Sequence, residues 1–143
     1  MQAPRSAYEE VGGIVFFGRM LDKIRLKAAG QLPDGYATGT KNWFAFDSRC
    51  CRLLGVKYPA LRKRVLQGGS DLEILKWAFR EGRKPGKEEI EIWNAFMKKR
   101  GWRDTAGLEE EKKAAGLGGR KDIQTFFDLF DVEEGRKLRR AET

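Results

Sequence analysis

Four charged side chains near the start of the chain have types and spacing suited to holding an anion: Arg19, Asp22, Lys23 and Arg25. At about 100° per residue they share one face of a predicted helix. Phe16 and Leu26 fall on the same face, and a face that met only water would not need these apolar residues. Charges that are covered must be paired or bound to a ligand. We therefore expect a ligand site along this face.

In such a site, Arg19 and Lys23 would bind the negative charge, and Asp22 would orient Arg19 or act as an acid or base. The chain has no histidine, the commonest general base. Asp22 is therefore the catalytic candidate if the protein is an enzyme, with proton transfer of the isomerase or lyase type as the reaction class. The alternative is an exposed ladder of ion pairs, because Asp22 lies three residues from Arg19 and from Arg25.

A second basic segment follows the first. Residues 41–64 contain seven Lys or Arg and one acid, Asp47, so an anionic partner is expected there. Arg49 and Arg52 lie three residues apart on a predicted helix and would together hold a phosphate or carboxylate. Asp47 would orient these cations, and Trp43 or Tyr36 would form an apolar wall. The predicted pocket lies between the first and second helices and takes a small anionic metabolite.

The two cysteines, Cys50 and Cys51, are adjacent, and on a helix their side chains diverge by about 100°. Reduced thiols are therefore expected. Core packing is the leading interpretation, and a reactive thiol near the helix start, flanked by two arginines, is the alternative. Two thiolates without any imidazole suit zinc poorly. We assign no metal and no cofactor.

The partner classes follow from charge and hydropathy. The longest clearly apolar run is Ile14–Phe17 and no apolar signal core begins the chain, so we expect a cytoplasmic protein with no membrane partner. The alternative to a small ligand is a non-enzymatic module that docks an acidic protein or non-specific nucleic acid on its basic face. A helix-turn-helix around Gly68-Gly69 is disfavoured, because Asp71 and Glu73 would be repelled by phosphate. The oligomeric state stays open.

Hydrophobic periodicity and turn residues predict one all-α domain, a compact orthogonal bundle of about six or seven short helices. Residues 1–13 are expected to be an extended lead-in, residues 14–131 the helical domain, and residues 132–143 a basic, partly frayed tail. The predicted helices span residues 14–29, 47–54, 59–67, 70–82, 87–100, 104–115 and 122–131, with Asp47, Ser70, Asp104 and Asp122 as caps. Residues 42–46 are read as an aromatic loop that packs on the core, together with aromatic residues at helical spacing: Trp77, Trp93, Phe96, Trp102, Phe126 and Phe127.

Several short motifs carry a family resemblance. They are Val11-Gly12-Gly13, Phe17-Gly18-Arg19-Met20-Leu21-Asp22-Lys23-Ile24-Arg25-Leu26, Arg49-Cys50-Cys51-Arg52, Gly68-Gly69-Ser70-Asp71, Trp93-Asn94-Ala95-Phe96-Met97, Gly101-Trp102-Arg103 and Asp122-Ile123-Gln124-Thr125-Phe126-Phe127-Asp128. With these motifs the chain resembles, over nearly its whole length, an uncharacterised family of small bacterial domains of unknown function. The resemblance implies a single compact domain and supplies no catalytic residue.

Overall fold

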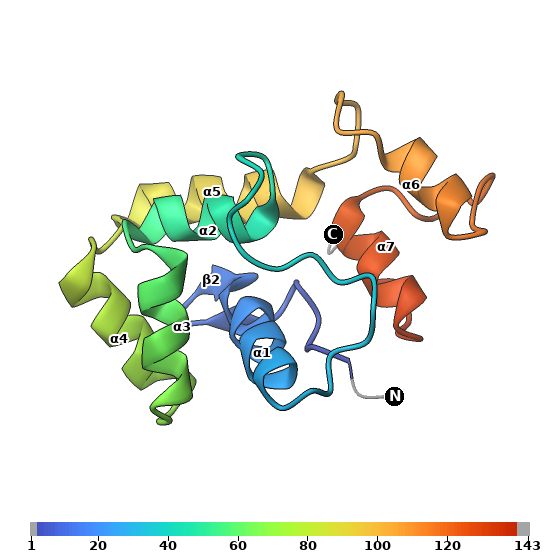
Figure 1. Ribbon diagram of the computed structural model, residues 1–143. Coiled ribbons are helices and arrows are strands. Elements are labelled where there is room, and N and C mark those ends of the chain that lie inside the picture. Colours follow the sequence, from blue (N-terminus) through green and yellow to red (C-terminus); the bar gives the residue numbers. More distant parts are fainter. Residues whose placement is uncertain (1–2, 140–143) are drawn as a thin grey trace.

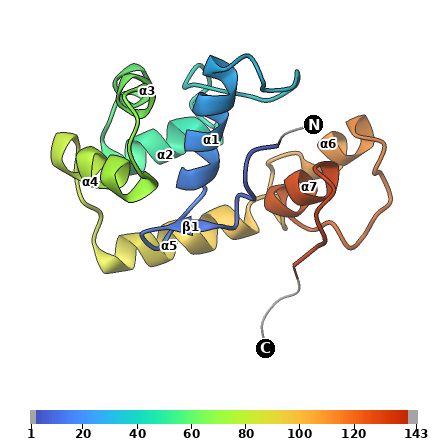
Figure 2. The same ribbon diagram turned by 90° about the horizontal axis from the view of Figure 1, so that it is seen from below.

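The first helix, α1 (Phe17–Ala28), is packed on several sides, and eight of its 12 residues are buried. It contacts α3 and the first strand of a small hairpin. In the computed structural model, which describes residues 3–139, α3 and α4 lie at one end of the molecule and α6 and α7 at the other (Figures 1 and 2). The described residues form seven helices and one two-stranded hairpin, which confirms the predicted mostly helical, compact domain.

The remaining elements follow the chain in this order: β1 (Glu10–Val11), β2 (Ile14–Val15), then after α1 come α2 (Phe46–Leu54), α3 (Tyr58–Leu66), α4 (Asp71–Glu81), α5 (Lys87–Lys99), α6 (Leu108–Ala114) and α7 (Phe126–Glu133). None of the described helices is long and apolar enough to cross a membrane.

The hairpin replaces part of the expected lead-in and first helix. β1 and β2 are antiparallel, with Val11 opposite Ile14, and the turn between them has Gly12 and Gly13 at positive φ. Phe16 also has a positive φ of 73°, so the chain changes direction there and α1 begins only at Phe17. The helix predicted from residue 14 therefore starts three residues later than expected.

Helix boundaries with a strong local signal agree with the sequence. Ser70 and Glu73 form the expected capping box of α4, and Gly55 ends α2 in the left-handed conformation. Three predicted caps are wrong. Ala45 is the cap of α2, so that Asp47 lies in its first turn; Gly107, not Asp104, precedes α6; and Thr125, not Asp122, caps α7 by accepting a bond from the Asp128 amide.

The C-terminal boundary also differs from the expected tail. α7 continues through Glu133, and the side chain of Glu134 is only 3% exposed. Arg136 donates a hydrogen bond to the Pro4 carbonyl at 2.6 Å, which ties this segment to the start of the chain. Residues 1–2 of the predicted lead-in and residues 140–143 of the predicted tail lie outside the described residues.

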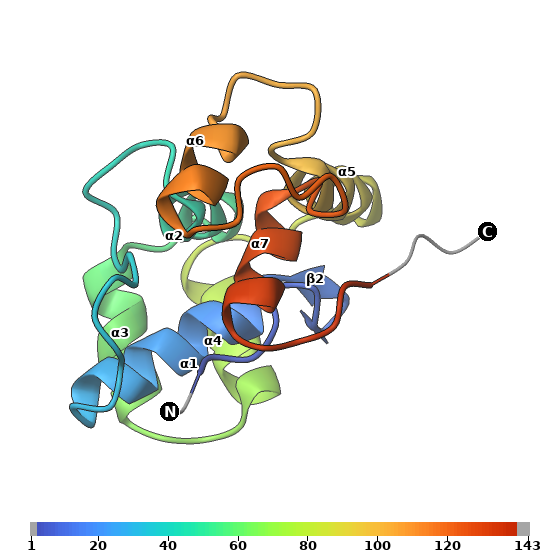
Figure 3. The same ribbon diagram turned by 90° about the vertical axis from the view of Figure 1, so that its right-hand side faces the viewer.

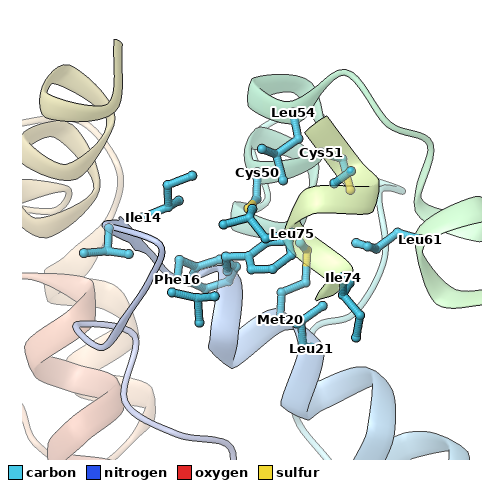
Figure 4. Close-up of a cluster of buried hydrophobic side chains, with 14 of the residues drawn as sticks. Ile14, Phe16, Met20, Leu21, Cys50, Cys51, Leu54, Leu61, Ile74 and Leu75 are labelled. Atoms are coloured by element: carbon cyan, nitrogen blue, oxygen red, sulfur yellow. The ribbon is translucent and has the colours of Figure 1, made fainter. Parts of the chain in front are cut away.

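The main hydrophobic core lies where the hairpin, α1, α2, α3 and α4 meet. Figure 4 shows the side chains that converge there, among them Phe16, Met20, Cys50, Leu54 and Leu61. A smaller cluster of Leu108, Ile123 and Leu129 joins α6 to α7. α5 is held against the hairpin by its Trp93, whose indole Nε1 donates to the Val15 carbonyl at 3.1 Å, and by Asn94, whose Nδ2 donates to the Gly13 carbonyl at 2.8 Å.

Some aromatic residues expected in the core lie on the surface. Trp93 and Phe127 are buried, but Phe96 is 41% and Trp102 47% exposed. The loop at residues 42–46 does not pack on the core as expected, because Trp43 and Phe44 face solvent and only Phe46 turns inward. Helical spacing identifies the apolar side of a helix but not whether another element covers that side, and the ring of Phe96 on α5 is left partly uncovered.

Candidate functional site

Arg19 lies on the charged face of α1 and is buried by the opposite end of the chain. Its two terminal nitrogens donate to the two carboxylate oxygens of Glu134 at 2.8 and 2.7 Å, and its guanidinium lies 4.8 Å from the Phe130 ring centroid. The Tyr36 hydroxyl donates to the same carboxylate at 2.7 Å. Burial alone would raise the pKa of Glu134, but hydrogen bonds from Arg19, Tyr36 and Arg136 hold it below its ordinary value. Arg19 is therefore neutralised within the protein.

Lys23, one turn further along α1, is buried in the same way. Its Nζ donates to Asp47 Oδ1 at 2.8 Å and to the Ala37 carbonyl at 2.9 Å. The other oxygen of Asp47 accepts a bond from the Gly39 amide at 3.0 Å. Burial lowers the pKa of Lys23 despite the opposing effect of Asp47. This ion pair attaches the long α1–α2 segment, which runs along one side of the molecule (Figure 3), to both helices.

Asp22 belongs to a four-residue ion cluster. It accepts bonds from the Arg5 backbone amide and guanidinium at 2.8–2.9 Å, and Asp71 pairs with Arg5 at 2.7 Å and with Arg25 at 2.8 Å. Burial would raise the pKa of Asp22, but the bonds from Arg5 outweigh it and lower the pKa. An ionised carboxylate with occupied oxygens is a weak base, so the geometry does not favour the acid–base role suggested for Asp22.

The predicted residues that remain exposed gather around Trp43. The Arg52 and Arg49 guanidinium carbons lie 4.4 and 5.1 Å from the centroid of its ring. Arg49 also lies 5.2 Å from the ring of Phe96 on α5. Neither arginine forms an ion pair with any of residues 3–139. Burial, followed by the positive charges of Arg100 and Arg52, lowers the pKa of Arg49.

The residues predicted to line one pocket thus occupy three separate places. Arg19 and Tyr36 both bind Glu134, and Lys23 binds Asp47. Arg49 and Arg52 both lie against the ring of Trp43. The sequence did not reveal the covering partners Arg5 and Glu134, because they lie far along the chain from α1. Nothing near Arg5 or Glu134 in the sequence pointed to a buried partner. Each was only a charged residue in a segment expected to be extended, for Arg5, or frayed, for Glu134.

An open groove adjoins this third group. It has a volume of about 880 Å³ and lies between residues 40–43, α2 and the start of α3; we call it the α2–α3 groove. Three cations line it, Lys41, Arg52 and Lys57, with Trp43 and Tyr58 as aromatic walls, and no Asp or Glu is among its lining residues. Both lysines belong to the basic segment at residues 41–64, but neither of them, nor Tyr58, was predicted to belong to a site.

The thiols near the groove are buried and neutral. Cys50 is fully buried and Cys51, which lines the groove, is 4% exposed. Burial raises the pKa of Cys51 to about 12 and that of Cys50 well above its ordinary value. This environment favours core packing over a reactive thiolate. Among residues 3–139, no three His, Cys, Asp or Glu side chains are arranged to hold a metal ion.

Sequence comparison agrees with the single-domain architecture. Residues 1–136 match one family model, described as a domain of unknown function, DUF5069. No curated protein matches the chain. Because the family model spans nearly the whole chain, the protein belongs to the DUF5069 family.

Proposed function

We propose that this protein binds a small anionic ligand, a phosphorylated or carboxylated metabolite, in the α2–α3 groove. The observation that supports the proposal is the charge of the groove lining. Lys41, Arg52 and Lys57 line it without an acidic neighbour in the lining, and none of the three pairs with a carboxylate of residues 3–139. Cations gathered around a concave surface attract anions, and a guanidinium binds phosphate or carboxylate through two parallel hydrogen bonds.

The cations of α1 are less suited to this role than the sequence suggested. Arg19 and Lys23 already hold Glu134 and Asp47 at 2.7–2.8 Å in buried surroundings. A ligand anion there would have to displace a buried carboxylate that already neutralises the cation. Binding to the groove cations displaces no carboxylate of residues 3–139. We therefore place the proposed ligand site between α2 and α3 rather than between α1 and α2.

The groove favours binding over chemistry. Burial raises the pKa of Tyr58 to about 12, and the Cys51 thiol is neutral for the same reason. These groups can donate hydrogen bonds, but neither provides a base at neutral pH. Trp43 and Tyr58 would contact an apolar or planar part of the ligand, and the cations would contact its charged part.

Inorganic pyrophosphate and citrate are suitable probes for a thermal-shift and calorimetric test. A ligand that binds only the folded protein raises its melting temperature, so we expect both anions to stabilise the natural protein. Arg52→Ala and Lys57→Ala should remove this effect. The matched control is Arg62→Ala, because Arg62 is an exposed arginine of α3 outside the groove. Full retention of the shift in Arg52→Ala, or its equal loss in Arg62→Ala, would refute the groove as the site.

A further inference from the structure

Arginine and aromatic side chains alternate across the surface beside the groove. In order they are Arg52, Trp43, Arg49, Phe96 and Arg100, joined by cation–aromatic contacts of 4.4, 5.1, 5.2 and 5.6 Å between guanidinium carbon and ring centroid. We call these five residues the arginine–aromatic ladder. It starts at α2 and the segment before it and reaches the C-terminal end of α5, where Phe96 contacts Arg49 of α2.

The aromatic members of the ladder are unusually exposed. Trp43 is 69% and Phe96 41% exposed, and Phe44 next to Trp43 is 63% exposed. Isolated apolar residues on a surface are ordinary, but here two exposed rings are joined through the Arg49 guanidinium between them, an arrangement suited to binding a partner. Arg49 helps to hold the group in place, because its Nε donates to the Phe44 carbonyl at 3.1 Å.

The charge of the ladder is positive and only partly compensated. Arg49 and Arg52 have no carboxylate partner among residues 3–139, and Arg100 has one at the edge, Asp104 at 3.4 Å. The guanidinium of Arg49 lies between two rings and close to two other cations. A partner that brings negative charge would relieve this repulsion.

We infer that the arginine–aromatic ladder binds single-stranded nucleic acid. Unpaired bases stack on aromatic rings and on guanidinium planes, and arginines contact the phosphates between them. An acidic protein would supply carboxylates for the arginines, but it would not supply a planar group beside each negative charge, as a nucleotide strand does. A duplex would keep its bases stacked on each other. The alternation of planes and charges therefore fits a single strand better than either.

This inference goes beyond anion binding in the groove, although Arg52 and Trp43 belong to both surfaces. Phe96 and Arg100 belong only to the ladder, whereas Lys41 and Lys57 belong only to the groove. Variants at these positions therefore distinguish strand binding by the ladder from anion binding in the groove. Phe96→Ala should weaken strand binding and leave pyrophosphate binding intact, and Lys57→Ala should abolish pyrophosphate binding whether or not a strand binds.

The test is fluorescence anisotropy of the full chain with a short labelled oligothymidine, at low and moderate salt. We expect binding that weakens as salt rises. Phe96→Ala and Phe96→Leu should each reduce affinity roughly fivefold or more, because both remove the stacking ring. Ile92→Ala is the control, since Ile92 is a 62% exposed apolar residue of the same helix outside the ladder. Arg49→Ala should reduce both affinity and salt dependence more than Arg62→Ala does.

Four results would overturn the inference. They are no binding at low salt, equal losses for Phe96→Leu and Ile92→Ala, equal losses for Arg49→Ala and Arg62→Ala, and a labelled duplex that binds as tightly as the strand. Competition by poly-glutamate at lower concentration than unlabelled oligothymidine would assign the ladder to an acidic protein instead. Circular dichroism of each variant establishes that the fold is retained, and Phe96→Leu keeps the apolar volume if Phe96→Ala unfolds.

Discussion

Arg19 and Glu134 form a two-bond ion pair across 115 positions of the chain, with side chains only 4% and 3% exposed. The pair joins the first helix to the residue that follows the last one. Tyr36 adds a third bond to the same carboxylate, so that three distant segments meet at one buried charge. The part of the charged face of α1 that carries Arg19 and Lys23 is thus internal, whereas Asp22 and Arg25 stay partly exposed.

Removal of one member of this pair should be strongly destabilising. In Glu134→Gln the buried guanidinium of Arg19 loses its counter-charge, and we expect the free energy of unfolding in urea to fall by about 3–5 kcal/mol. The control is Asp122→Asn, which breaks an exposed pair with Arg120 and should change the free energy of unfolding very little, because solvent screens exposed pairs. Similar losses in the two variants would show that burial does not set the strength of the Arg19–Glu134 pair.

Because Gly18 has no side chain, the side chain of Arg5 can pack closely against α1. A Cβ at this helical position would lie 2.7 Å from Arg5 Nη1 and 2.9 Å from Arg5 Cδ. Gly18→Ala should therefore destabilise the protein, although alanine is favoured over glycine in a helix by about 1 kcal/mol. In an Arg5→Ala background the same change should become neutral or stabilising. A double-mutant cycle measured by urea unfolding checks this coupling, and additive effects would contradict it.

The ion cluster around Asp22 should make stability depend on acid pH. The pKa values of Asp22 and Asp71 lie below their ordinary value of 3.8, so the unfolded chain binds more protons than the folded one in the range just below that value. The contribution of these groups is complete above pH 3.8 and is lost as pH falls through the lower folded values. Asp22→Asn should lower stability at neutral pH and flatten the acid-side decline.

Asp131 provides the comparison of opposite sign. Burial raises its pKa, and its Oδ1 has no hydrogen-bond partner among residues 3–139. Its protonation favours the folded state as pH falls through its raised folded value. Asp131→Asn should therefore leave the acid-side decline at least as steep as in the natural protein. Urea unfolding at a series of pH values measures both variants, and a flatter curve for Asp131→Asn than for Asp22→Asn would contradict the assignment.

The two thiols should resist labelling in the folded protein. Burial keeps Cys50 and Cys51 protonated, and the thiolate is the reactive form. We expect Ellman's reagent at pH 8 to react with neither thiol in native protein and with both after unfolding in urea. Rapid labelling of Cys51→Ser would identify Cys50 as accessible, and rapid labelling of Cys50→Ser would do the same for Cys51 and restore the reactive-thiol hypothesis.

The sequence predicted the features that depend on neighbouring residues. The capping box of Ser70 and Glu73 and the left-handed Gly55 each fix a helix end through local hydrogen bonds and backbone freedom. The partners of α1 were not predictable in this way. Glu134 and Arg5 reach Arg19 and Asp22 only because the chain folds back. Phe96 shows the same limit, since periodicity placed it on an apolar side, but no element among the described residues covers its ring completely.

The buried bond between Lys23 and Asp47 has a consequence for Trp43, which lies in the same segment. Lys23 also holds the Ala37 carbonyl, and Asp47 holds the Gly39 amide, so the backbone is fastened just before the tryptophan and just after it. An exposed ring on a tethered loop is already ordered before a partner binds, so binding would lose little conformational entropy at this ring. Lys23, which is buried on α1, thereby restricts the motion of Trp43, which is 69% exposed.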